Sequence, residues 1–214
     1  MAEMDEDLAL LDRWCGGDAA AGNTLFRNHF EAIYRFFENK LDRDVDDLVQ
    51  ETFLACMHGR SSFRRHSSFR TYAFAIARNL LYRYWRDRGR TPATVDFEAV
   101  SIAALSTSLG ARLVRREDQA LMLDALQTLP LEQQLLIELH YWEELDADQL
   151  SEVFDTAPAT SRSRLFRARE ALRAHLSRSP ALPAEASASG LDSWARALHP
   201  LATGSDPSDD ESAV

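Results

Sequence analysis

Apolar side chains recur every three or four residues along most of the first 90 positions, which is the spacing of one face of an α-helix. The pattern predicts a helix ending before Gly16, a second capped by Asp18, a third capped by Asp44 or Asp46, and a fourth over residues 68–88. No alternating apolar and polar run predicts a strand of useful length. Four such helices can enclose one hydrophobic core.

The periodicity stops between about residues 89 and 110, where Thr, Ala and Ser dominate. Roughly twenty residues without periodicity is long for a loop inside a compact domain and indicates a domain boundary. Beyond it, the pattern predicts a helix starting beside Pro130, a short helix over 147–154 capped by Asp146, and a last helix from about residue 159 to 176.

The predicted fold is therefore all-α, with two small helical domains joined by a flexible linker. The boundaries that we expect are a first domain at 1–90, a linker at 91–115, a second domain at 116–178 and a disordered tail at 179–214, rich in Ser, Ala, Pro and Asp. Within that tail, helical spacing relates Leu191, Trp194, Ala195 and Leu198. They form either a packing patch, which we favour, or a partner-binding segment.

Composition places the chain among globular proteins without a membrane-spanning segment. It has 214 residues, of which 45% are apolar and 27% charged, and no uncharged apolar run approaches the roughly 18 residues that span a bilayer. The acidic N-terminus does not resemble a secretory signal. Cys15 and Cys56 form neither a disulfide framework nor a metal knuckle, so we expect a reducing, cytoplasmic setting.

The net charge of −10 conceals two basic blocks. Residues 60–90 carry 9 Arg against the single acid Asp87, and residues 160–178 carry 6 Arg against Glu170. Such blocks are candidate phosphate-binding surfaces even in an acidic protein.

The second block belongs to a predicted helix-turn-helix, in which a short helix, a connection containing Pro158 and a longer helix follow one another. The N-terminal turns of such a second helix present small polar and Arg side chains to base edges in the major groove. The residues that supply them are Thr160, Arg162, Ser163, Arg164 and Arg167. A solvated face of an ordinary amphipathic helix is the alternative.

In the first block, Arg residues alternate with aromatic ones, as in Arg83, Tyr84, Trp85 and Arg86. Rings that stack on exposed bases and cations that follow the backbone are what single-stranded nucleic acid requires. Adjacent residues point about 100° apart on a helix, so Tyr84 and Trp85 cannot both face one core. The alternative is a buried aromatic helix end with extended Arg side chains.

Several strings resemble the extracytoplasmic-function (ECF) sigma factors of bacterial RNA polymerase over residues 8–90 and 118–176. For region 2 of that family they are Asp47-Leu48-Val49-Gln50-Glu51-Thr52-Phe53-Leu54, Ser68-Phe69-Arg70-Thr71-Tyr72 and Ile76-Ala77-Arg78-Asn79-Leu80. For region 4 they are Leu129-Pro130, Ser163-Arg164-Leu165 and Arg167-Ala168-Arg169.

This resemblance implies a role in transcription initiation, with region 2 in the first domain and region 4 in the second. By similarity, the helix bearing Asp47, Gln50, Glu51 and Phe53 docks on the clamp coiled coil of the polymerase large subunit. The −10 promoter element would be met by Arg64, Arg65, Arg70, Arg78, Asn79, Tyr84 and Trp85. The −35 element would be read by Thr160, Arg162, Ser163, Arg164 and Arg167. The family also implies an anti-sigma factor as a partner.

The sequence departs from the family pattern at the turn of the helix-turn-helix. Asp155 stands where the family often has Gly, and Asp tolerates left-handed backbone less well. Residues 159–162 read Ala-Thr-Ser-Arg in place of the frequent Gly-Thr-Val-Lys, so the family's −35 preference does not carry over.

The sequence also bears on two other classes of function. A stand-alone helix-turn-helix repressor or activator accounts for residues 130–176 but leaves the aromatic-Arg block without a purpose. An enzyme is disfavoured, because the chain has no Gly-rich phosphate loop, no zinc-spaced Cys/His set and six scattered His. We therefore expect no catalytic residue, no metal site and no cofactor.

Overall fold

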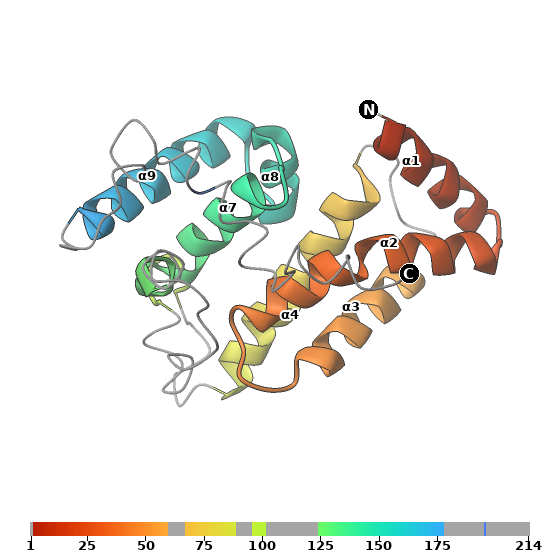
Figure 1. Ribbon diagram of the computed structural model, residues 1–214, viewed down its shortest axis with the longest axis horizontal. Coiled ribbons are helices and arrows are strands. Elements are labelled where there is room, and N and C mark those ends of the chain that lie inside the picture. The colour runs from red at the N-terminus through yellow and green to blue at the C-terminus, as the bar shows by residue number, and fades with distance from the viewer. Residues whose placement is uncertain (1, 60–66, 89–95, 102–123, 178–194, 196–214) are drawn as a thin grey trace, which may run out of the picture. The chain divides into compact units, whose positions relative to one another are not determined.

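The computed structural model of the protein describes residues 2–59, 67–88, 96–101, 124–177 and 195, with side chains from residue 6 onward (Figure 1). Its named elements are α1 (Ala2–Cys15), α2 (Ala19–Glu38), α3 (Val45–Gly59), α4 (Phe69–Arg88), α7 (Leu131–Tyr141), α8 (Ala147–Phe154) and α9 (Pro158–Leu176). Residues 124–128 are also helical. The all-α prediction is confirmed, and no helix in these ranges is long and apolar enough to cross a membrane.

Contacts group the chain into two compact units. The first unit comprises residues 1–95 and 145–161, and the second comprises residues 96–144 and 162–214. Helix α8 belongs to the first unit because it packs on α4.

The core of the first unit is built from the apolar faces of α1 to α4. The Trp14 ring meets the Phe26 and Phe69 rings edge to face, with centroids 5.1 Å and 6.0 Å away. Gly22 makes this possible, because a Cβ atom there would lie 2.4 Å from the Trp14 ring. The predicted cap of α2 is confirmed: the Asp18 carboxylate accepts from the backbone N–H groups of Ala20 and Ala21.

Lys40, the one lysine in the sequence, lies inside this core. Its Nζ donates a hydrogen bond of 2.7 Å to the backbone oxygen of Phe36 and lies 4.5 Å from the centroid of the Phe36 ring. A backbone carbonyl and an aromatic face therefore both stabilise the buried ammonium group.

The second unit packs α7 and α9 around a cluster that includes Leu126, Tyr141 and Trp142. Part of the predicted linker joins it: the backbone N–H of Leu131 donates to the oxygen of Val100, and Phe97 is buried. Residues 96–101 therefore pair with the start of α7.

A particular residue determines where α8 begins, and another determines where it ends. Asp146 caps the helix as predicted, in a reciprocal capping box with Gln149. Asp155 ends it in the left-handed conformation, with φ 51° and ψ 53°. Helix α9 then begins at Pro158, whose missing N–H costs nothing in the first turn of a helix.

Candidate nucleic-acid interface and docking surface

The four predicted docking residues, all on α3, differ in their exposure to solvent. Asp47 and Gln50 are exposed, whereas Phe53 is buried. Glu51 forms an ion pair with Arg83 of α4. Asp47 and Gln50 are thus the members of this set most accessible to a partner.

An apolar groove of about 610 Å³ lies between α2 and α3. Three of its side chains are large, apolar and accessible: Phe30 is 46% exposed, Leu54 43% and Met57 47%. The Phe30 ring stacks on the Phe53 ring, with 6.4 Å between centroids. Contiguous exposed apolar side chains of this size are typical of interaction sites.

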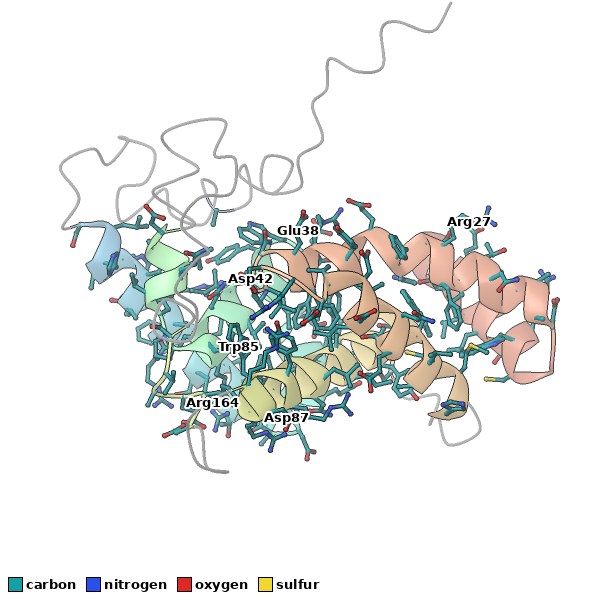
Figure 2. All side chains as sticks on the ribbon, turned by 90° about the horizontal axis from the view of Figure 1, so that it is seen from below. Arg27, Glu38, Asp42, Trp85, Asp87 and Arg164 are labelled. Carbon is teal, nitrogen blue, oxygen red and sulfur yellow. The ribbon has the colours of Figure 1, made fainter. Side chains whose placement is uncertain are left out.

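The rim of this groove is polar. Asp46 and Gln50 come from α3, and Arg27 and Glu31 come from α2, where Arg27 points away from the helix (Figure 2). Phe30, Leu54 and Met57 belong to the apolar periodicity from which the sequence predicts helices that enclose one core, so the sequence did not predict the groove. Periodicity identifies an apolar face but not whether another element covers it.

The middle of α4 carries the predicted pair Arg78 and Asn79. Arg78 donates from Nε and a terminal nitrogen to Asn79 Oδ1, at 3.2 Å and 2.7 Å, and Asn79 is exposed. The Arg78 guanidinium also lies 5.5 Å from the centroids of the Tyr82 and Phe154 rings. Arg70, in the first turn of α4, is half-buried.

Near the end of α4, Tyr84 and Arg88 both interact with the carboxylate of Asp44. The Tyr84 hydroxyl donates to Asp44 Oδ2 over 3.4 Å, and Arg88 forms an ion pair with the same carboxylate. The Arg88 guanidinium lies 4.4 Å from the centroid of the Tyr84 ring. Partial burial raises the pKa of Tyr84 above its usual value, which further favours the neutral phenol that donates this hydrogen bond.

Trp85 differs from its neighbour. The residue, labelled in Figure 2, is only 6% exposed. Its ring meets the Tyr84 ring edge to face at 5.4 Å. Of the two rings predicted to meet nucleic acid, Trp85 is thus buried in this structure, whereas Tyr84 is half-buried. Arg64 and Arg65 lie outside the described residues.

The N-terminal half of α9 carries the five residues predicted to read the −35 element. Arg162, Ser163 and Arg167 are exposed, whereas Thr160 is half-buried. Arg164 is held differently, because its guanidinium pairs with the carboxylates of Glu132 and Glu98, the latter at 2.9 Å. Arg164 thus ties α9 to the start of α7 and to residues 96–101.

No group of three or more His, Cys, Asp or Glu side chains in the described ranges has the arrangement of a metal site. Neither Cys15 nor Cys56 is part of a disulfide.

Comparison with known proteins identifies the family. The model of sigma-70 region 2 matches residues 25–91, and that of sigma-70 region 4 matches residues 119–172. The ECF RNA polymerase sigma-E factor of Haemophilus influenzae is 30% identical over 179 residues, covering 79% of this chain and 95% of that protein. The sigma-E factor of Escherichia coli strain K12 is 27% identical over 181 residues, covering 80% and 95%.

Two solved structures share the fold. CnrH in complex with the cytosolic domain of CnrY has a TM-score of 0.56 at 23% identity, covering 80% of this chain and 97% of that one. The sigma factor RpoE of Bartonella quintana, in complex with the anti-sigma factor NepR, has a TM-score of 0.51 at 24% identity, covering 72% and 94%. Sigma factors are not enzymes as a class. From these matches, the chain belongs to the ECF sigma factors, which direct RNA polymerase to specific promoters and assist promoter melting.

Proposed function

We propose that this sigma factor acts through three separate surfaces: a polymerase-docking surface on α2 and α3, a −10 surface on α4 and a −35 surface on α9. The observation that carries the proposal is the arrangement of the first unit, where the apolar groove and Gln50 lie on α2 and α3 while Arg78, Asn79 and Tyr84 lie on α4. One rigid core thereby supports both a protein-binding and a nucleic-acid-binding surface.

The docking surface combines apolar and polar contacts. Exposed Phe30, Leu54 and Met57 lose water when a partner covers them. Gln50 at the rim of the groove and Asp47, exposed elsewhere on α3, provide hydrogen bonds that fix the partner's orientation. Glu51 contributes to the same surface and is also paired with Arg83, so it links α3 with α4.

The −10 surface consists of Arg70, Arg78, Asn79 and Tyr84, together with Arg64 and Arg65 of the preceding loop. Asn79 offers its amide N–H groups to a base edge, and the Arg side chains offer positive charge to phosphates. The Tyr84 ring is suited to stack on an unpaired base. Trp85 supports that ring from within the core.

The −35 surface consists of Thr160, Arg162, Ser163 and Arg167, which read duplex DNA from the N-terminal half of α9. Arg164 belongs to this surface as a positioning residue, because its guanidinium is held by Glu132 and Glu98.

The chain works in the cytoplasm without catalytic activity of its own. An anti-sigma factor restrains it, as the RpoE–NepR complex of Bartonella quintana supports by analogy. A stand-alone repressor or activator remains the second candidate, favoured by the exposed Arg residues of α9. Strong sequence-specific binding to duplex DNA without polymerase would support it against the first proposal.

Substitution of Leu54 tests the docking surface. Leu54→Ser should weaken binding to core RNA polymerase by about tenfold, because it replaces an accessible apolar contact with a hydroxyl. Leu8→Ser on α1 is the matched control, since Leu8 is 41% exposed but does not line the groove. It should leave affinity unchanged. Titration of labelled protein with core enzyme measures both.

Run-off transcription on DNA from upstream of the protein's own gene completes the test. Wild-type chain and Leu8→Ser should support specific initiation, whereas Leu54→Ser should need more protein for the same yield. Equal affinity of Leu54→Ser and wild type would remove the groove from the docking surface. A wild-type chain that does not bind core enzyme would contradict the whole proposal.

A further inference from the structure

Three side chains form a network where the residue just before α3 meets the last turns of α4. Tyr84 and Arg88 are four positions apart on α4 and therefore lie on the same face of that helix. Both contact one oxygen of Asp44, which accepts from the Tyr84 hydroxyl over 3.4 Å and forms an ion pair with the Arg88 guanidinium. That guanidinium also lies over the Tyr84 ring, 4.4 Å from its centroid. Each member of the network thus contacts the other two.

The backbone of Asp44 adopts a conformation that is uncommon for a residue with a side chain. Its φ is 63°, in the left-handed region, and its carbonyl oxygen accepts from the N–H of Leu48 in α3 over 3.1 Å. This conformation costs free energy, so it persists only where the surrounding structure stabilises it, and residues of this kind concentrate at functional sites. In this position the Asp44 carboxylate is directed at α4.

The network is accessible to a ligand. The side chains of Asp44 and Arg88 are each 36% exposed, and Tyr84 is half-buried. Buried Trp85 supports the edge of the Tyr84 ring, with 5.4 Å between the centroids. An ion pair as exposed as that of Asp44 and Arg88 contributes little to the stability of a fold, because water and salt screen it. A competing anion can therefore separate the two side chains while the protein stays folded.

Nucleic acid offers the same groups that the network already uses. A DNA phosphate binds a guanidinium through charge-assisted hydrogen bonds, as a carboxylate does. An unpaired base stacks on an aromatic face, and the Arg88 guanidinium covers one face of the Tyr84 ring. In the free protein, Asp44 therefore occupies a cation that suits a phosphate, and Arg88 occupies a ring face that suits a base.

We propose that Arg88 is a further residue of the −10 surface and that Asp44 is a positioning residue, which keeps Arg88 over the Tyr84 ring until single-stranded DNA displaces it. A backbone phosphate replaces the Asp44 carboxylate on Arg88, and an unpaired base replaces the guanidinium on the ring. Duplex DNA offers phosphates but no free base face, so the complete exchange selects the melted strand. This inference rests on the proposed −10 surface, to which Tyr84 belongs.

Binding of the full-length chain to a labelled single-stranded DNA of about 12 nucleotides, measured by fluorescence anisotropy at low salt, tests the exchange. Asp44→Asn removes the charge that pairs with Arg88, whereas Asn still adopts left-handed backbone and still accepts from the Tyr84 hydroxyl. It should tighten binding by about two- to fivefold, the range expected for an exposed ion pair. Asp42→Asn is the matched control, because it removes the same charge from a nearby carboxylate that pairs with Arg43. It should leave the affinity close to that of wild type.

The same substitution in an Arg88→Ala background separates the exchange from a general effect of charge. With no guanidinium to release, Asp44→Asn should give no further gain in affinity. The slope of log affinity against log salt should fall by about 0.7 in Arg88→Ala, because one phosphate contact to a single strand is lost. An equal gain from Asp44→Asn in both backgrounds, or no gain in either, would overturn the proposal.

A second measurement follows Arg88 in the wild-type chain. With ¹⁵N-labelled arginine, the Arg88 Nε–H signal, assigned by its loss in Arg88→Ala, should shift when the same DNA saturates the protein. Arg78→Ala distinguishes a failure of the network from a failure of the −10 surface. Weaker binding by Arg78→Ala together with an unmoved Arg88 signal would overturn the network and leave the −10 surface in place. Unchanged binding by Arg78→Ala together with an unmoved Arg88 signal would overturn both.

Discussion

At the scale of single residues, the two cysteines illustrate how burial controls reactivity. Cys56 lies fully buried in α3, and burial raises the pKa of its thiol from 9.0 to about 12. Cys15, at the end of α1, is exposed. The thiolate is the reactive form, so burial and the raised pKa both protect Cys56.

Alkylation with N-ethylmaleimide at pH 8 should therefore modify Cys15 and spare Cys56 in the folded protein, and modify both in denaturant. Mass spectrometry of the peptides measures the difference, and a folded Cys15→Ser variant should remain unlabelled. Because the folded-state pKa is the higher one, the stability from the neutral Cys56 thiol is complete below pH 9.0. It declines as the pH rises from there toward about 12. Equal labelling rates of the two cysteines would contradict this account.

The same scale shows what local sequence could not reveal. The sequence predicts that Tyr84 and Trp85 point in different directions, and the structure determines that Trp85 is the buried one. In the sequence, Arg164 does not differ from the other Arg residues of a basic helix. In the structure, it forms ion pairs with Glu132 and Glu98, which are 32 and 66 positions away in the sequence. Spacing along a helix specifies a face, whereas such partners depend on tertiary packing.

At the scale of elements, the C-terminal end of α8 shows how the backbone conformation of one residue determines where a helix ends. The helix ends at Asp155 with φ 51°, a conformation that costs an L-residue about 1–2 kcal/mol. Glycine adopts this conformation without that cost. Glycine also has more conformational freedom in the unfolded chain, which lowers the free energy of unfolding by about 0.4–1 kcal/mol and so offsets part of the gain.

Asp155→Gly should therefore raise the free energy of unfolding, by about 0.5–1 kcal/mol. Ala157→Gly is the control, because Ala157 lies in the same connection and is not among the described residues with positive φ. It should be neutral or destabilising. Urea denaturation followed by circular dichroism measures both. A loss of stability in Asp155→Gly would mean that the Asp155 side chain stabilises the turn by more than its strain costs.

Elements were also the most predictable part of the fold. The fourth helix was predicted over residues 68–88 and is observed as Phe69–Arg88, and the caps at Asp18 and Asp146 are confirmed. These features depend on local chemistry, which the sequence carries directly. The groove between α2 and α3 was not predicted, because it depends on which apolar faces the other helices leave uncovered.

At the scale of the whole molecule, charge is segregated. The chain carries a net charge of −10, yet exposed Arg162 and Arg167 stand at the N-terminal half of α9 within a basic block. Sequence-independent binding to DNA depends on such cations, because they release counterions from phosphates. The net negative charge repels DNA outside these basic surfaces, so we expect contacts from the polymerase to contribute to tight promoter binding.

Replacing Arg162 and Arg167 together by Ala should weaken promoter binding by the polymerase complex and flatten its salt dependence. For each phosphate contact removed, the slope of log affinity against log salt should fall by about 0.9. Arg173→Ala is the control, since Arg173 pairs with Glu170 near the end of the same helix. It should leave the slope as in wild type. If the double variant keeps the wild-type slope, these side chains do not contact phosphates.

The burial of Lys40 determines which chemical modifications the folded protein can undergo. Its ammonium is enclosed against the carbonyl and ring of Phe36, and the sequence offers no other lysine. Acetylation and ubiquitin attachment therefore find no lysine side chain on the surface of the folded chain. Cross-linking to a partner through lysine fails for the same reason, so carboxylate- or thiol-directed reagents are the appropriate choice for mapping its complexes.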